Sequence, residues 1–165
     1  MKRKTTLRRK NVSRLAAPQA TIGFRLWQVH HQWLRFFDQR LDGLNLTHLQ
    51  FVLLVACDHL ARQGEVPSQS QLASFTAFDK MMVSKALRLL ETKAYLKRGR
   101  HPDDPRAKRI DLTREGSRVL QRAKTIAEKA LGEFFGVLGK KQRGLSDLLQ
   151  ELMTAHGGEC PASDL

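Results

Sequence analysis

The chain of 165 residues carries 29 lysine and arginine residues against 16 acidic ones, a net charge of +13, and 41% of its residues are hydrophobic. This apolar content is enough for a core, and so basic a balance is typical of proteins that bind a polyanion. No apolar run reaches the ~18 residues of a membrane helix, and the first residues lack the apolar stretch of a signal peptide. We therefore expect a cytoplasmic protein without a membrane partner, although charge alone does not separate DNA, RNA and anionic lipid.

Residues 1–17 are expected to form a basic arm outside the fold, because residues 1–14 hold basic side chains, no acidic one and few apolar ones. Two interpretations stay open: a disordered, solubilising tail, or an arm that adds phosphate or minor-groove contacts. Residues 18–155 then form one domain, and residues 156–165 a flexible tail.

Apolar residues at a spacing of three to four predict a long amphipathic helix from Ile22 to Leu41, which Gly43 ends. A second helix is expected to begin after the N-cap residue Thr47 and to run to Gly64. Because this second helix is apolar around much of its circumference, we expect it to lie at the centre of the fold.

Ser68 and Gln71 have the spacing of a capping box, which predicts a short helix that ends near residues 76–78. Asp79 can cap the next helix, over residues 80–93. Its expected inward face consists of Val83, Ala86, Leu87 and Leu90. Two short helices across a tight turn are typical of a helix-turn-helix.

Residues 95–100 and 108–112 have strand-like composition and flank a charged tip at residues 102–105, which predicts a two-stranded hairpin, or wing. Thr113 is expected to cap a long helix that includes Val119, Phe134 and Leu138. A last helix should carry Leu145, Leu148, Leu149, Leu152 and Met153 on one side. The predicted fold class is mainly α with a small β-hairpin wing.

In a helix-turn-helix, the N-terminal residues of the second helix contact base edges in the major groove. Here they include Lys80, Met81 and Met82; we expect one methionine to pack in the core and Met81 to be the exposed one. For the lysines the alternative is a solvated helix face. In the wing, an arginine held by a nearby carboxylate would suit the narrow minor groove, and Arg106 is the main candidate, its alternative being a weak surface salt bridge.

Three segments resemble the multiple-antibiotic-resistance regulator (MarR) family of winged helix-turn-helix regulators. They are LTHLQF at residues 46–51, DKMMVSKALRLLETKAYLKR at residues 79–98 and DPRAKRIDLTREGSRVL at residues 104–120. The resemblance implies that Asp104 and Arg106 are the wing pair, with the arginine in the minor groove. The complete set of DNA-contact candidates is Ser70, Gln71, Lys80, Met81, Met82, Ser84, Lys85, Arg88, Arg100, Asp104, Arg106 and Lys108.

The resemblance also implies a homodimer, in which residues 20–43 and 114–155 supply the dimerisation helices around a winged helix at residues 45–113. It implies double-stranded DNA and a small-molecule effector of unknown identity as partners, and repression at a pseudo-palindromic operator. Ala94 departs from the family pattern, which has glycine at the end of the recognition helix, and this puts the local turn in doubt.

Other functions find less support. The chain has no glycine-rich phosphate loop, nucleophile elbow or clustered acid–base pair, so we expect no enzyme, and we expect neither a cofactor nor a metal because the histidines lack ligand spacing. Cys57, in an apolar helix, is expected to be an inert core thiol rather than a redox sensor, and Cys160 to be exposed in the tail. An architectural nucleic-acid-binding protein is the main alternative, and a protein-binding adaptor is the third.

Overall fold

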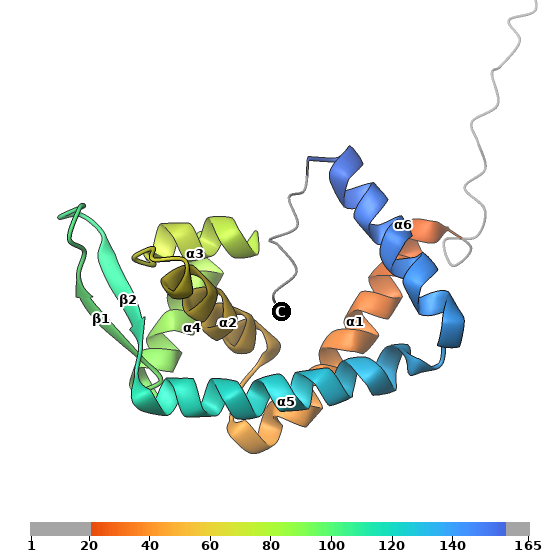
Figure 1. The fold of residues 1–165 in the computed structure, drawn as a ribbon, viewed down its shortest axis with the longest axis horizontal. Helices are drawn as coiled ribbons and strands as arrows, with labels where there is room; N and C mark the ends of the chain where they lie inside the picture. Colours follow the sequence, from red (N-terminus) through yellow and green to blue (C-terminus); the bar gives the residue numbers. More distant parts are fainter. Residues whose placement is uncertain (1–20, 158–165) are drawn as a thin grey trace, which may run out of the picture. The chain divides into compact units, whose positions relative to one another are not determined.

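The computed structural model describes residues 21–157, and Figure 1 shows how the elements follow one another. The basic arm at residues 1–17, Cys160 and all but the first two residues of the expected tail lie outside these residues. The helices and strands are α1 (Ile22–Leu41), the 3-10 turn η2 (Asp42–Leu44), α2 (His48–Arg62), α3 (Gln69–Thr76), α4 (Lys80–Thr92), β1 (Leu96–Arg100), β2 (Lys108–Leu112), α5 (Arg114–Gly136), the 3-10 turn η3 (Gly139–Lys141) and α6 (Gln142–Ala155). No single helix among them is long and apolar enough to cross a membrane, and only one bent pair of helices passes a test of length and composition together.

The chain divides into two compact units between Trp33 and Leu34, within α1. In the first unit, aromatic rings follow one another along the helix: the centroids of Phe24 and Trp27 are 5.7 Å apart, and those of Trp27 and His31 are 4.3 Å apart. Nδ1 of His31 lies 2.8 Å from the Trp27 carbonyl oxygen, one helical turn away. The first turns of α1 thus have local order of their own.

The core of the second unit is built around α2, as its apolar circumference predicted. Leu53, Leu54 and Leu60 are almost completely buried, and α2 contacts α3, α4, α5 and β2. The helix begins after Thr47, whose hydroxyl accepts a hydrogen bond from the Gln50 amide at 3.3 Å. The Gln50 side chain in turn accepts one from the Thr47 amide at 3.3 Å, which completes a capping box. The expected N-cap is confirmed, while the helix ends two residues before the expected Gly64.

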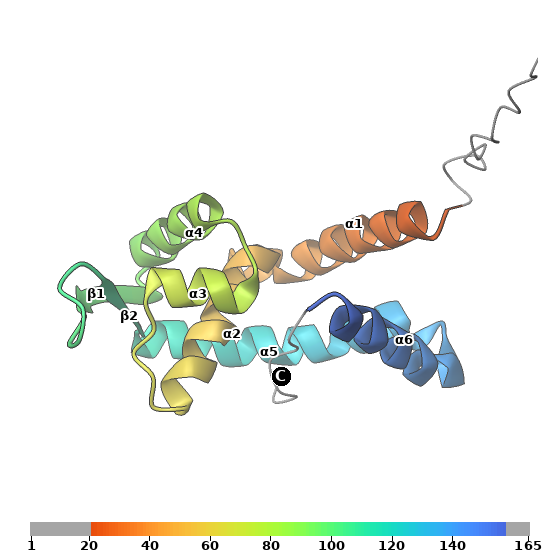
Figure 2. The ribbon, with the colours of Figure 1, turned by 90° about the horizontal axis from the view of Figure 1, so that it is seen from above.

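Only part of α5 belongs to this core. Its buried residues are Gly116, Val119, Leu120, Ala123, Ala127 and Ala130, and the helix contacts α2 and β2. The helix ends at Gly136, so Leu138 lies beyond it. None of the residues of α6 is buried. Figure 2 shows α6 at the far end of α5 from the wing, and Leu148, Leu149 and Leu152 of α6 are 61%, 37% and 51% exposed.

Candidate nucleic-acid interface

The start of α3 is fixed by the capping box that the sequence predicted. Ser68 Oγ accepts a hydrogen bond from the Gln71 amide at 3.3 Å, and Gln71 Oε1 accepts one from the Ser68 amide at 2.9 Å. Gln71 also donates through Nε2 to Glu65 at 3.4 Å. The Gln71 side chain is therefore committed to the fold, whereas the neighbouring Ser70 is exposed.

The helix α4 presents a polar and basic face outward. Asp79 Oδ1 accepts hydrogen bonds from the amides of Met81 and Met82, at 2.8 and 3.2 Å, so the predicted cap is confirmed. The inward face is the predicted one, since Val83, Ala86, Leu87 and Leu90 are all buried. The outward residues are Lys80, Met81, Met82, Lys85 and Arg88, which are exposed, and Ser84, which is half-buried.

One expectation about α4 is wrong. Met81 is 69% exposed, as expected, but Met82 is also 50% exposed, so neither methionine belongs to the core. Successive helical residues are turned by about 100° from one another, which places Met82 beside the buried stripe and not in it. Val83 and Leu87 already fill that stripe.

The wing is an antiparallel pair of β1 and β2, in which Leu96 pairs with Leu112 and Arg100 with Lys108. Arg100, Arg106 and Lys108 are all exposed, on or close to its tip. The Asp104 carboxylate accepts a hydrogen bond from the backbone amide of Arg106 at 2.8 Å. Within residues 21–157 the Arg106 guanidinium forms no ion pair. Asp104 therefore orders the turn that carries the arginine but does not hold its side chain, which differs from the expectation of an arginine held by a nearby carboxylate.

His101 and Ile110, whose roles sequence reasoning missed, join the wing to the loop between α2 and α3. Nε2 of His101 lies 3.2 Å from the Val66 carbonyl oxygen, and its Nδ1 accepts hydrogen bonds from the amides of Asp103 and Asp104, both at 3.2 Å. The Ile110 amide donates to the Pro67 carbonyl at 2.8 Å. The wing tip is therefore tied to the loop between α2 and α3. Only packing between distant segments reveals this role, so no local signal could have shown it.

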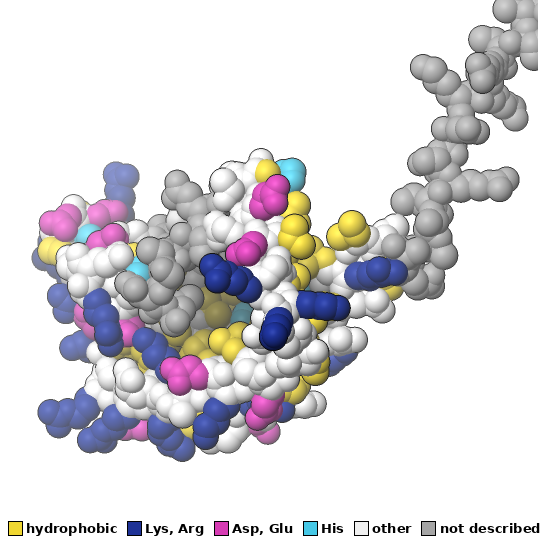
Figure 3. All heavy atoms as spheres, turned by 45° about the vertical axis from the view of Figure 1, so that its right-hand side comes forward, with side chains coloured by type: hydrophobic (Ala, Val, Ile, Leu, Met, Phe, Trp, Pro, Cys, Tyr) yellow, Lys and Arg dark blue, Asp and Glu magenta, His cyan; other side chains and the backbone are white. Residues whose placement is uncertain are grey.

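Positive charge dominates the exposed side chains of α4 and the wing. The exposed basic residues include Lys80, Lys85, Arg88, Arg100, Arg106 and Lys108, and the exposed acidic residues are Asp79, Glu91, Asp103 and Asp104. Glu91, near the end of α4, forms an ion pair with Arg98 at 3.0 Å. The carboxylates of Asp79 and Asp104 both accept backbone hydrogen bonds. Lys and Arg side chains gather along the left and lower margins of the molecule in Figure 3. Such a surface attracts a polyanion.

The end of α4 is joined to the start of α5 around the Tyr95 carbonyl. Ala94 has φ of +58°, so the alanine adopts the left-handed conformation for which the family pattern has glycine, and the turn is kept. Thr113 donates to the Tyr95 carbonyl through its amide at 3.1 Å, and to the Ala94 carbonyl through its hydroxyl at 2.6 Å. Gly116 lies directly against Tyr95. Neither Tyr95 nor Gly116 was singled out from the sequence.

Cys57 has the environment of an unreactive thiol. It is 1% exposed, and its Sγ donates a hydrogen bond to the Ile110 carbonyl at 3.4 Å. Burial, with smaller contributions from the charges of Asp111 and Asp58, raises the pKa of Cys57 to about 12. Redox sensing requires a thiolate that is accessible to solvent. The Cys57 thiol is buried, and its raised pKa keeps it protonated. No group of three metal-ligating side chains lies together among residues 21–157.

Comparison with known proteins decides the family. A model of the MarR family matches residues 46–108. The uncharacterized HTH-type transcriptional regulator YdcH of Bacillus subtilis (strain 168) is 39% identical over 141 residues, which cover 86% of this chain and 95% of that protein. The chain belongs to the MarR family of transcriptional regulators. These matches confirm the predicted family and the mainly helical winged-helix fold. The MarR family is a family of transcription regulators and not a class of enzymes.

Solved structures agree with the MarR fold. A probable transcriptional regulator from Pseudomonas aeruginosa superposes with a TM-score of 0.72 at 27% identity, over 81% of this chain and 98% of that one. A mutant of MarR from E. coli, complexed with operator DNA, superposes with a TM-score of 0.71 at 20% identity, over 79% of this chain and 92% of that one. At this lower identity the likeness concerns the fold alone.

Proposed function

We propose that this MarR-family regulator is a homodimer that binds duplex DNA at a pseudo-palindromic operator and represses transcription there. The observation that carries the proposal is the exposed, basic surface of α4 and the wing, with no acidic side chain on the outward face of the first turns of α4. A helix of this width fits the major groove, and an arginine at a wing tip suits the narrow, negative minor groove.

Each element has its own part in the proposed contact. Ser70 and the amide groups at the start of α3 face phosphates, and α4 reads base edges through Lys80, Met81, Met82, Ser84 and Lys85. Arg88, Arg100 and Lys108 neutralise the backbone, and Arg106 enters the minor groove from a turn that Asp104 and His101 hold in place. Phosphate contacts set the register, whereas base contacts set the sequence preference.

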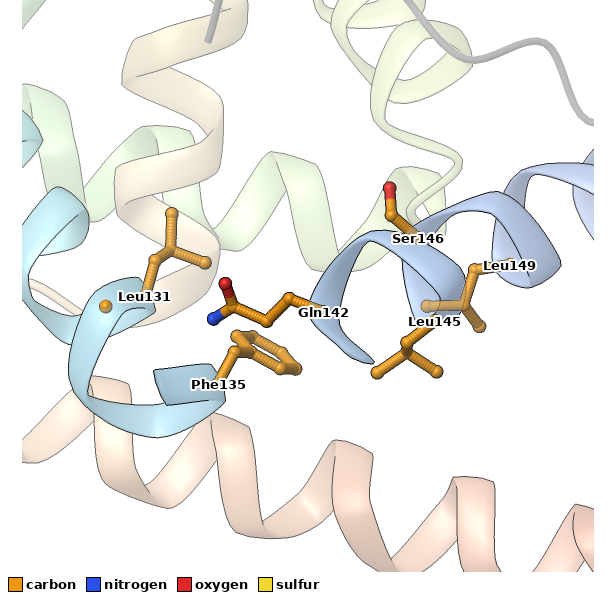
Figure 4. A pocket seen from close by; sticks show the side chains of 7 residues that line it. Leu131, Phe135, Gln142, Leu145, Ser146 and Leu149 are labelled. Atoms are coloured by element: carbon orange, nitrogen blue, oxygen red, sulfur yellow. The ribbon is translucent and has the colours of Figure 1, made fainter. Parts of the chain in front are cut away.

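The proposed dimer covers the apolar surface at the junction of α5 and α6. A cavity of about 420 Å³ is lined by Leu131, Gly132, Phe135, Gln142, Leu145, Ser146 and Leu149. Figure 4 shows Gln142 beside Phe135, with Leu145 and Leu149 projecting from α6. Leu148 and Leu152 of α6 are 61% and 51% exposed. The exposed leucines of α6 favour burial of this surface against a second copy of the chain, and a two-fold dimer matches a palindromic site.

Control by a small-molecule effector, which membership of the family implies, is also part of the proposal.

The test begins with selection of bound sequences from a random duplex pool, followed by titration of the selected operator and a scrambled duplex at two salt concentrations. We expect a pseudo-palindrome with half-sites about 10 base pairs apart, bound ~10³-fold or more tightly than the scrambled duplex. Equal, steeply salt-dependent binding to both duplexes would instead support the architectural alternative.

A pair of variants separates the wing contact from general charge. Arg106→Ala should weaken operator binding by ~1–3 kcal/mol per half-site. Arg122→Ala removes the same charge from an exposed position on α5 and serves as the matched control. Equal losses in both variants would mean that Arg106 contributes charge alone, and no loss would remove it from the mechanism.

A further inference from the structure

The outward face of α4 is basic overall, but its first turn carries two exposed apolar side chains at the place where polar base readers are expected. Met81 is 69% exposed, and it lies opposite the buried stripe because Val83 and Leu90 point inward. Met82, 50% exposed, extends this apolar surface toward one edge of the helix. Asp79 fixes the backbone of both residues by accepting their amide hydrogen bonds, so the two side chains leave the helix from an ordered turn.

Few polar side chain types are available around these methionines to read base edges. Asparagine and glutamine form bidentate contacts with adenine, and arginine and lysine with guanine; of these four types, residues 80–87 contain only lysine. Lys80, Lys85 and Ser84 are the hydrogen-bonding residues there. Lysine and serine can also bond to phosphate, so on their own they discriminate poorly between sequences.

An apolar side chain in the major groove has one complementary group on natural bases, the 5-methyl group of thymine. Lys85 lies one helical turn after Met81 on the same helix face, and Lys80 directly precedes Met81; the charge of these exposed lysines brings the helix to the polyanion on which that methyl group lies. We propose that Met81, assisted by Met82, is a specificity-determining residue of this regulator, and that it selects operators with a thymine methyl group in each half-site. The inference rests on the proposed function, because it assumes that α4 enters the major groove.

The size of the effect follows from the contact. Burial of one methyl group between a methionine and a base lowers the dissociation constant of the protein–operator complex about four-fold. Two symmetric half-sites then give a difference of about sixteen-fold between an operator that has both methyl groups and one that lacks both.

The experiment uses the full chain and the operator obtained from the random pool. Each thymine of the half-site is replaced in turn, in both half-sites together, by deoxyuridine, which keeps every hydrogen-bonding group and lacks only the methyl group. We expect at least one thymine position at which this replacement weakens binding by about sixteen-fold, with the other positions close to unchanged.

Protein variants assign the methyl contact to its side chain. In Met81→Ala the penalty for deoxyuridine at that position should fall to less than about four-fold, because the contact is already absent, and Met82→Ala should reduce it by less. Leu89→Ala is the matched control, since Leu89 is a 54% exposed apolar residue further along α4, and it should leave the penalty unchanged. Because Met81 is exposed, its replacement should leave the thermal unfolding temperature unaltered. The deoxyuridine scan with the wild-type chain tests the inference independently of these variants.

The outcomes are distinct. An operator that shows no deoxyuridine penalty at any thymine, or a penalty that persists undiminished in both methionine variants, overturns the inference and leaves the proposed function standing. A pool that yields no preferred sequence overturns both. A penalty that is lost in Met81→Ala and kept in Leu89→Ala establishes methyl readout.

Discussion

Replacement of Gly116 by alanine tests the joint between the recognition helix, the wing and α5. A Cβ atom at this position would lie 1.9 Å from the Tyr95 carbonyl oxygen and 2.8 Å from its carbonyl carbon. Both atoms belong to the backbone, so no side-chain rotation can relieve the clash. The first turn of α5 would have to move away from Tyr95.

The expected change in the free energy of unfolding is the sum of opposing effects. Overpacking against backbone costs about 1–3 kcal/mol, and the movement also stretches the Thr113 hydrogen bonds to Tyr95 and Ala94, worth about 0.5–1.5 kcal/mol each. Alanine is a better helix former than glycine by up to about 1 kcal/mol, which acts in the other direction. We expect Gly116→Ala to lower the free energy of unfolding by about 2–4 kcal/mol.

The assay is urea unfolding followed by circular dichroism at a fixed protein concentration, because a dimer's stability depends on concentration. Gly144→Ala is the matched control: Gly144 is likewise the third residue of its helix, and a Cβ there meets nothing within 4 Å. That variant should be as stable as the wild type or up to about 1 kcal/mol more stable. If Gly116→Ala matches the control, the close approach to Tyr95 has no energetic weight and the reasoning is refuted.

Two further predictions concern Ala94 and Cys57. Ala94→Gly should raise the free energy of unfolding by about 0.5–1 kcal/mol in the same assay, because relief of the left-handed alanine outweighs the greater freedom of glycine in the unfolded chain; a less stable variant would contradict this. In a Cys160→Ser background, the native Cys57 thiol should resist iodoacetamide at pH 8 and react once urea unfolds the chain. Since burial raises the pKa of Cys57 from 9.0 to about 12, its contribution to stability is complete below pH 9 and is lost as the pH rises toward 12. Cys57→Ala should therefore lose less stability over that range than the wild type, and identical pH profiles would count against the buried neutral thiol.

The parts of the fold that could be predicted are those set by local chemistry. An N-cap side chain and the amide that it satisfies lie within three residues, so Thr47, Ser68, Asp79 and Thr113 could each be recognised from the sequence, and each caps its helix in the structure. The inward face of α4 followed from helical periodicity in the same way.

Apart from helix ends and the local turn at Arg106, the errors and omissions involve contacts between segments that are distant in the chain. Whether Met82 is buried depends on what packs beside α4, and periodicity leaves an edge position undecided. His101 bonds to Val66, 35 residues away, and Gly116 is required by the backbone of Tyr95. These residues need a three-dimensional arrangement before their roles can be stated.

The Tyr95 joint also bears on how a reading head of this kind keeps its geometry. The Tyr95 amide donates to the Leu90 carbonyl at 2.9 Å, and its carbonyl accepts from Thr113, so one residue holds the end of α4, the first strand of the wing and the N-terminus of α5. The wing tip is tied separately, through His101, to the loop before α3. With both ends of the hairpin attached, Arg106 keeps a fixed place relative to α4, which simultaneous contact with a minor and a major groove would require. Because α5 continues from this joint toward the α6 surface, the proposed dimer contact would set the spacing between two such heads.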